Sequence, residues 1–324
     1  VLIALFASNS VFAQTQTTTD ELLALQYYNN QEYDKAIVLY EKLFNRNPSI
    51  YLYNYYFECL IALEDYKKAE RLTSGLIKKN PAVFRYQVDE GYVYLKTGNQ
   101  KKHIKSMQAA INNLSPTVDN YMALAQYFEI RGLKDWSTKT YEKAIEQFPY
   151  NEVFSYELIY LYYDNNQLED MFEQIFKVID NPASQIENLQ ERLQAIAATD
   201  HTEQLLNKFI QYVLRRVQRK PQNIAYADIL LWAYIQNSDF ERAMTQAIAM
   251  DKRQNREGEI IIDIVPTFIE NKEYAEAVRG INYIITLGSK ASYYYNAKVL
   301  LIDIKYLQAT SIIPSSIEIL KEIE

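Results

Sequence analysis

Glycine is scarce in this chain, with 7 residues in 324, and proline is nearly as rare, with 8. A typical protein contains about 7% glycine, roughly three times the share found here. Both residues concentrate in turns and irregular loops, so a chain with so few of them has little room for such segments. The shortage predicts an all-α protein whose helices are joined by short connections.

Side chains for thiolate or imidazole chemistry are equally few. Cys59 is the only cysteine, and His103 and His201 are the only histidines. One cysteine excludes an internal disulfide, and the two histidines lack the helical spacing of a metal site. Phosphate-binding glycine loops and the Gly-x-Ser-x-Gly nucleophile motif are also missing. We expect no cofactor, no metal and no catalysis, and we interpret Cys59 and His103 as packing residues.

The charge balance is acidic, with a formal net charge of −7 and a pI near 5.2. Such a chain repels phosphate backbones, which argues against nucleic acid as a partner. The one basic run, Arg215 to Lys220, precedes Pro221 at the end of a helical pattern. We interpret its cations as partners of the carboxyl end of a helix dipole.

The first thirteen residues, VLIALFASNSVFA, form a short apolar stretch that ends in small residues and is followed by polar sequence. This is typical of a signal peptide whose charged start is missing, with the mature chain beginning at Gln14. The stretch is too short to span a bilayer, and no later segment reaches transmembrane length. We expect an exported protein, periplasmic or else outer-envelope associated or secreted. A buried N-terminal helix is the alternative interpretation of this stretch.

The chain repeats itself. Residues 32–48 read EYDKAIVLYEKLFNRNP, and residues 65–81 read DYKKAERLTSGLIKKNP, with Ala36 and Ala69 in matching positions. Apolar residues in each stretch fall on one face of a 3.6-residue helix. Self-similarity at this period is typical of a solenoid built from repeated helix pairs. The prolines that end these stretches recur every 33 to 35 residues: Pro48, Pro81, Pro116, Pro149 and Pro182.

The repeat resembles the tetratricopeptide (TPR) family, whose unit carries W-x₂-L-G-x₂-Y, then A-x₃-F, then P. The resemblance implies a right-handed superhelical solenoid of antiparallel helix pairs. Small residues such as Ala24, Gly91 and Ala277 would let the two helices of a pair approach closely, while tyrosine rings fill the remaining space. The unit that ends at Pro149 matches the pattern at Tyr121, Leu124, Ala125, Phe128, Gly132, Ser137, Tyr141 and Ala144.

The pattern divides the chain into five parts. These are a truncated signal peptide at 1–13, a TPR-like array of about five units at 17–182, a divergent helical pair or joint at 183–222, TPR-like units at 223–288, and C-terminal helices at 289–324. The last part includes a long helix after Gly288 and a short one after Pro314. It is either a capping unit or a truncated one.

The resemblance also implies where a partner binds, because the first helix of each TPR unit lines a concave groove. It favours a non-catalytic scaffold that binds a partner protein or peptide of unknown identity. The sequence does not determine the oligomeric state. Carried over to this chain, the candidate groove residues are Tyr51, Tyr55, Arg85, Tyr92, Lys96, Gln126, Glu129, Tyr156, Ile159, Tyr163, Asp228 and Trp232.

Two other functions remain open at this stage. The chain would also suit the sensing or docking module of a larger envelope signalling protein. Alternatively, its 29 tyrosines could serve as sugar platforms in a glycan-binding component.

Overall fold

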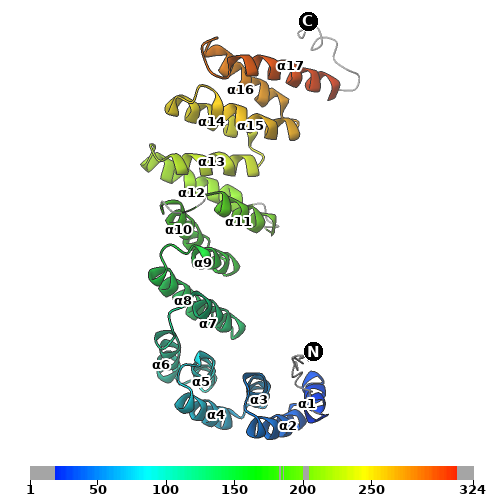
Figure 1. Cartoon of the computed structure of the whole chain (residues 1–324), viewed down its shortest axis with the longest axis vertical. Helices are drawn as coiled ribbons and strands as arrows, with labels where there is room; N and C mark the ends of the chain where they lie inside the picture. The colour runs from blue at the N-terminus through cyan, green and yellow to red at the C-terminus, as the bar shows by residue number, and fades with distance from the viewer. Residues whose placement is uncertain (1–18, 182–183, 185, 200–203, 312–324) are drawn as a thin grey trace, which may run out of the picture. The chain divides into compact units, whose positions relative to one another are not determined.

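The computed structural model describes residues 19–181, 184, 186–199 and 204–311. The predicted signal peptide, Pro182, His201 and the predicted helix after Pro314 lie outside the described residues. Regular secondary structure in the described part is α-helical throughout (Figure 1). The helices follow one another with short connections, and within each unit most of them pack on the next helix in the chain. This confirms the all-α, TPR-like succession of helix pairs.

The chain forms two compact units, Val1–Phe148 and Pro149–Glu324. The division falls at Pro149, one of the regularly spaced prolines. The domain boundaries expected at residues 182, 222 and 288 stay predictions. Unit 1 contains α1 (Thr19–Asn29), α2 (Tyr33–Arg46), α3 (Ile50–Ala62), α4 (Tyr66–Lys79), α5 (Phe84–Lys96), α6 (Gln100–Asn112), α7 (Val118–Ile130) and α8 (Lys134–Gln147). Unit 2 contains α9 (Val153–Asp164), α10 (Leu168–Ile179), α11 (Ile186–Thr199), α12 (Leu205–Arg219), α13 (Ile224–Gln236), α14 (Phe240–Gln254), α15 (Glu259–Glu270), α16 (Tyr274–Thr286) and α17 (Tyr294–Ser311).

In the seven helix pairs whose connecting turn the structure describes, that turn is built in the same way. One residue takes a left-handed backbone conformation, and the N–H of the next residue donates to a carbonyl five positions back, as Asp65 does to Leu60. This bond closes the first helix in the manner of a Schellman motif. The same residue is also the N-cap of the second helix, so one position ends a helix and starts another. The left-handed residues are Gln31, Glu64, Gly98, Gly132, Asn166, Ser238 and Lys272.

The connections between pairs use the prolines and polar caps. Pro48 precedes Ser49, whose hydroxyl accepts from the Leu52 N–H at the start of α3, and Thr117 caps α7 in the same way after Pro116. These side chains satisfy N–H groups that a helix leaves unpaired at its start. Pro266 is an exception, because it lies inside α15.

The predicted small residues lie buried between helices. Ala24, Ala36, Ala69, Ala125 and Ala277 have no exposed surface. Gly91 is buried as well. A Cβ added there would lie 2.1 Å from Cε of Met107. Each unit therefore has its own apolar core between its helix pairs.

The region around α11 and α12 departs from the regular pairing. α11 lies against α9, α10 and α13. α12 packs on α13. It also contacts α10, because the ring of Phe209 on α12 lies 5.4 Å from that of Phe172 on α10. The predicted basic run ends α12, where Arg216 pairs with Glu173 and Lys220 lies 3.9 Å from Asp180. The charge of the basic run is therefore partly neutralised by Glu173 on α10 and by Asp180, the residue that follows α10.

Candidate functional site

All twelve candidate groove residues lie on first helices of pairs: α3, α5, α7, α9 and α13. Their exposure divides them into three groups, and whether any of them contacts a partner stays a prediction. Tyr51, Lys96, Gln126 and Glu129 are exposed; Tyr55, Arg85, Tyr92, Tyr163, Asp228 and Trp232 are half-buried; Tyr156 and Ile159 are buried.

A tyrosine cluster joins the first helix pair to α3. The ring of Tyr55 stacks on that of Tyr40 at 5.1 Å and meets the edges of Tyr28 and Tyr51 at 4.8 and 5.0 Å. Tyr40 is buried, whereas Tyr51 is 48% exposed. Offset and edge-to-face contacts of this kind add to the apolar burial. Tyr55 is therefore held in place, while Tyr51 offers ring surface to solvent.

Two cations on α5 lie over aromatic rings. The guanidinium of Arg85 is 4.4 Å from the ring centre of Tyr127 on α7, and Nζ of Lys96 is 5.3 Å from that of Tyr92. Within the described residues, neither cation forms an ion pair. The rings orient both charges without neutralising them, because a cation–π contact leaves the net charge in place.

Gln126 and Glu129 on α7 differ in their contacts. Glu129 accepts a hydrogen bond from the Ser137 hydroxyl at 2.7 Å and one from Tyr141 at 3.4 Å, both on α8. Its carboxylate is thus engaged within its own helix pair. The side chain of Gln126, in the interior of α7, is exposed to solvent.

A buried polar network beside these residues was not anticipated from the sequence. Asp89 on α5 has no exposed surface. Its carboxylate accepts from the hydroxyl of Tyr53 on α3 at 2.7 Å and from that of Tyr127 on α7 at 2.9 Å. Arg131, the C-cap of α7, donates from Nε at 2.8 Å. One carboxylate therefore joins the first helices of three consecutive pairs.

Arg131 completes the network. Its side chain is only 8% exposed and also donates to Glu58 on α3 at 2.5 Å. Its guanidinium lies over the rings of Phe57 and Tyr92 at 5.1 and 5.4 Å. Burial raises the pKa of Asp89 to about 6, although Arg131 and the two tyrosine hydroxyls act to lower it. Burial acts to lower the pKa of Arg131, but the carboxylates and Tyr127 outweigh it, so that pKa is raised and the guanidinium stays charged.

The sequence holds only a weak signal for this network. Asp89 lies between the polar residues Gln87 and Glu90 in the sequence, so its burial is not evident there, although a buried carboxylate requires partners. Those partners are 36 to 42 residues away, at positions where the repeat pattern has no polar signature.

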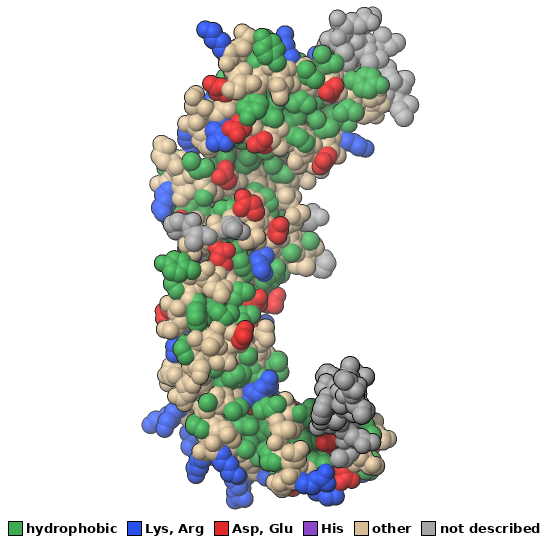
Figure 2. Space-filling model, viewed as in Figure 1, with side chains coloured by type: hydrophobic (Ala, Val, Ile, Leu, Met, Phe, Trp, Pro, Cys, Tyr) green, Lys and Arg blue, Asp and Glu red, His purple; other side chains and the backbone are tan. Residues whose placement is uncertain are grey.

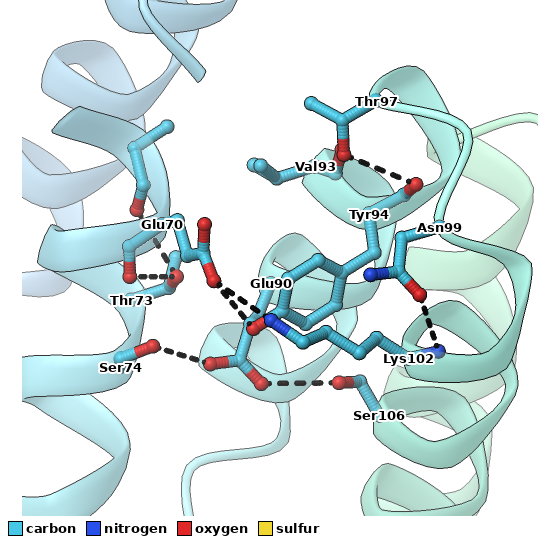
Figure 3. Close-up of polar contacts among 11 residues, drawn as sticks. Glu70, Thr73, Ser74, Glu90, Val93, Tyr94, Thr97, Asn99, Lys102 and Ser106 are labelled. Atoms are coloured by element: carbon cyan, nitrogen blue, oxygen red, sulfur yellow. Dashed lines mark hydrogen bonds and ion pairs between the residues drawn. The ribbon is translucent and has the colours of Figure 1, made fainter. Parts of the chain in front are cut away.

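Carboxylates also tie the second and third pairs together on the side of the second helices (Figure 3). Glu90 on α5 accepts from Ser74 on α4 at 2.6 Å and from Ser106 on α6 at 3.0 Å. Glu70 on α4 accepts from the hydroxyl of Tyr94 on α5 at 2.9 Å. Lys and Arg side chains gather at the surface over α4 and α6 (Figure 2).

His103 and Cys59 have the packing roles that the sequence predicted. His103 Nδ1 lies 2.9 Å from the Gly91 carbonyl, and Nε2 lies 3.3 Å from the indole nitrogen of Trp136. The indole donates, so Nε2 accepts and Nδ1 carries the proton. Burial raises the pKa of the Cys59 thiol to about 12, which leaves it protonated and unreactive.

In unit 2, the candidates on α9 face α11. The guanidinium of Arg192 lies 4.4 Å from the ring centre of Tyr156, whose hydroxyl donates to Glu152 at 2.6 Å. The hydroxyl of Tyr163 lies 3.4 Å from Thr199 Oγ1. Ile159 is 1% exposed and belongs to the apolar core, so its side chain has no surface for a partner. A cavity of about 340 Å³ opens beside these residues, lined by Tyr156, Tyr160, Asn188, Glu191, Arg192 and Ala195.

The two candidates on α13 are also partly enclosed. Burial raises the pKa of Asp228, with Arg256 opposing and Glu187 reinforcing the shift. Trp232 packs against the core of unit 2. Both residues therefore combine packing with a small exposed surface.

The described residues contain neither a metal-binding cluster nor a membrane-spanning helix. No three His, Cys, Asp or Glu side chains come together there as a metal ion would require. In the same part of the chain, no helix combines the length and the apolar character needed to cross a bilayer.

The chain is similar in fold to several solved structures. One is a chain in the crystal structure of the APC/C hetero-tetramer Cut9–Hcn1, which is 13% identical in sequence and has a TM-score of 0.31. The match covers 90% of the present chain and 56% of the Cut9–Hcn1 chain. The C-terminal part of a TPR repeat-containing protein from Cytophaga hutchinsonii is 17% identical over 85% of this chain and 98% of its own, with a TM-score of 0.32. A tetratricopeptide repeat protein from Parabacteroides merdae is 12% identical over 81% and 98%, with a TM-score of 0.27.

No protein-family model and no curated protein sequence matches the chain. This chain spans only about half of the Cut9–Hcn1 chain that it matches. All three TM-scores are below 0.5, so the likeness adds no argument about the site. The TPR-like assignment rests on the recurring helix pairs and their turns.

Proposed function

We propose that this chain with a TPR-like fold is a non-catalytic scaffold that binds a partner protein or peptide on its first-helix face. One observation supports the proposal above the others. Arg85 and Lys96, on one helix, point their charges at rings and have no ion pair within the described residues. The half-buried ring of Tyr92, together with cations whose charge is not neutralised, suits the anchoring of an extended or helical peptide.

The network around Asp89 supports the same proposal. It joins α3, α5 and α7 through buried hydrogen bonds, so the rings and cations beside it are held in fixed positions. A preorganised surface loses less conformational entropy when a partner binds. Arg131 contributes to this rigidity and not to partner binding, because its guanidinium already forms ion pairs with Glu58 and Asp89.

The test is a matched pair of charge reversals within one helix pair. Partners are first captured by cross-linking in an envelope extract and identified by mass spectrometry. The double variant Arg85→Glu with Lys96→Glu on α5 is expected to weaken binding of the captured partner at least tenfold. The control, Lys101→Glu with Lys105→Glu on α6, makes the same change of charge on the second helix and is expected to leave affinity within twofold.

Helical content of both variants is checked by circular dichroism. Equal affinities of the two variants would show that the first-helix face of α5 is not the binding surface. Capture of no reproducible partner above an unrelated helical protein would count against the scaffold function itself.

We also propose that the chain is exported to the periplasm. The support is the signal-like sequence of residues 1–13, followed by polar residues from Gln14. Sequencing the amino terminus of the protein from its native cells tests this proposal. A mature chain that begins at Gln14 is the expected result, and retention of residues 1–13 would contradict it.

A further inference from the structure

Two second helices of unit 1, α4 and α6, carry a basic surface although the chain has a net charge of −7. Together they contain eight Lys and Arg residues and one carboxylate, Glu70. Glu70 pairs with Lys102 at 3.4 Å, and Lys68 pairs with Glu41 on α2 at 2.8 Å. The other six cations are exposed and form no ion pair within the described residues. We call these six the α4–α6 basic surface: Lys67, Arg71, Lys78, Lys79, Lys101 and Lys105.

The two helices are fixed beside each other, so their cations belong to one surface. The carboxylate of Glu90 on α5 accepts from Ser74 on α4 at 2.6 Å and from Ser106 on α6 at 3.0 Å (Figure 3). One carboxylate therefore joins α4 to α6. Figure 2 shows the Lys and Arg side chains gathered at the surface over these two helices.

The charges point away from the packed sides of their helices. Each of Lys67, Arg71, Lys101 and Lys105 stands two residues before a buried side chain of its own helix. Two residues correspond to about 200° around an α-helix, so each cation lies almost opposite a buried neighbour. On α4 the cations extend from Lys67 to Lys79, which is about 18 Å of helix length at 1.5 Å per residue.

This arrangement indicates a broad anionic surface as the partner. The six cations are spread over two adjacent helices, whereas an extended peptide contacts charges along a single line. Five of the six are lysines, whose ammonium groups act as point charges, without the rigid fork that arginine uses for bidentate recognition. Point charges suit lipid headgroups, which move within the plane of a membrane and have no fixed pattern.

The same residues disfavour nucleic acid. The exposed residues of α4 and α6 include no aromatic ring on which a base could stack. Only one arginine, Arg71, is available for the bidentate contacts that read base edges. The net negative charge of the whole chain also repels a long phosphate backbone.

We propose that the α4–α6 basic surface holds the protein on a membrane that contains anionic lipids, through contacts of its Lys and Arg side chains with headgroup phosphates. Basic residues near such a membrane each add to the binding, and their contribution falls off within one Debye length. The proposal goes beyond partner binding and is independent of it, because it uses neither Arg85 nor Lys96.

Flotation of the full chain with lipid vesicles tests the proposal. The native chain is expected to bind vesicles of phosphatidylcholine with phosphatidylglycerol at least tenfold more tightly than vesicles of phosphatidylcholine alone. Raising NaCl from about 0.1 M to about 0.5 M shortens the Debye length from about 10 Å to about 4 Å and should remove most of this difference.

Matched charge reversals locate the binding surface. Lys67→Glu with Arg71→Glu on α4, and Lys101→Glu with Lys105→Glu on α6, are each expected to weaken binding to the anionic vesicles at least tenfold. The control, Arg85→Glu with Lys96→Glu, makes the same change of charge on α5 and is expected to stay within twofold of the native chain. The apolar residues 1–13 are the same in all variants, so they do not affect the comparison.

Three outcomes would overturn the proposal. One is equal affinity of the native chain for charged and neutral vesicles. Another is an equal loss in the α5 control, which would show that total charge decides the binding. The third is binding of a DNA duplex or of polyglutamate without binding of anionic vesicles, which would assign the surface to nucleic acid or to an acidic protein. The partner-binding assay is read separately, so failure of one proposal leaves the other standing.

A spin label on α4 gives an independent readout. Gly75 is exposed between Arg71 and Lys78, and an added Cβ there has nothing within 4 Å. The native thiol of Cys59 is buried, so a nitroxide reagent is expected to label Gly75→Cys alone. Anionic vesicles should lower the collision rate of this label with a water-soluble nickel complex at least twofold. The rate for a label at Gln126→Cys on α7 should not change, and equal changes at the two sites, or none at residue 75, would contradict the proposal.

Discussion

Arg131 and Asp89 are 42 residues apart in the sequence, yet Nε of Arg131 donates to Oδ1 of Asp89 across 2.8 Å. Asp89 has no exposed surface, and the Arg131 side chain has 8%. The pair is the centre of the contacts that join α3, α5 and α7, and it supports the surface that carries Arg85 and Lys96. Its energetics can be measured without knowing the partner.

Removal of one member of this pair should strongly destabilise the protein. Asp89→Ala leaves the buried guanidinium with only the half-buried Glu58, and such breaks cost about 3–5 kcal/mol. Urea unfolding followed by circular dichroism at 222 nm measures the free energy of unfolding. Arg131→Met is expected to have a similar effect, and the double variant should lose clearly less than the two losses added together. Additive losses would mean that the two side chains do not depend on each other.

Asp89 should also make stability depend on pH. Its pKa is about 6 in the folded chain, above the ordinary value of 3.8, because burial disfavours the charged form. A raised pKa means that the folded chain holds this proton more tightly than the unfolded chain. The stabilisation is therefore complete below about pH 4 and is lost as the pH rises through about 6.

Asp89→Asn serves as the reference for this pH dependence, since it removes the titration with little change of shape. The free energy of unfolding of the native chain minus that of the variant should fall between pH 4 and 6.5. A difference that stays flat over this range would show that Asp89 does not titrate there.

Two glycines in helix interiors should respond in opposite ways to the same substitution. An added Cβ at Gly75 in α4 has nothing within 4 Å, whereas at Gly280 in α16 it would lie 2.6 Å from Sδ of Met244 and 2.8 Å from Cγ2 of Ile261. Gly75→Ala should raise the free energy of unfolding by about 0.5–1 kcal/mol through helix propensity. Gly280→Ala should lower it by about 1–3 kcal/mol through overcrowding. Thermal and urea unfolding of both variants measure the difference, and a gain at both sites would contradict the close packing at Gly280.

The turns inside the helix pairs should prefer glycine at the left-handed position. Glu64 has φ 57° and Gly98 has φ 76° at equivalent places in two turns. A residue with a side chain is strained by about 1–2 kcal/mol in this conformation, and glycine avoids that strain. Glycine also loses more conformational entropy on folding, which offsets part of the benefit. Glu64→Gly should therefore stabilise the chain by up to about 1 kcal/mol, and Gly98→Ala should destabilise it by about the same amount. If both variants lose stability, the recurring turn is not strained at Glu64.

Much of the fold could be predicted from the sequence because its causes are local. The scarcity of glycine and proline, the prolines at 33 to 35 residues and the face of apolar residues in 32–48 depend on helix geometry and short connections alone. Contacts within one pair or between neighbouring pairs use the same positions each time, which is why Ala36, Ala69 and Ala277 could be expected in the core.

The candidate surface could be predicted only in part. The resemblance placed twelve residues on first helices, and all twelve lie there, but their surroundings differ. Tyr156 is buried and has the guanidinium of Arg192 over its ring, and Ile159 belongs to the apolar core of unit 2. Arg85 and Lys96 keep accessible charges because their neighbours are tyrosine rings. The pattern of the repeat is the same in each case, so it carries no information about these differences.

The sequence by itself determined that this protein is a row of helix pairs, because periodic apolar residues and helix ends act over a few residues at a time. Only the tertiary structure decided that Asp89, Tyr53, Tyr127 and Arg131 meet in one buried network. Hydrogen bonds between side chains depend on how three helices approach one another, and that approach is set by packing over many residues at once.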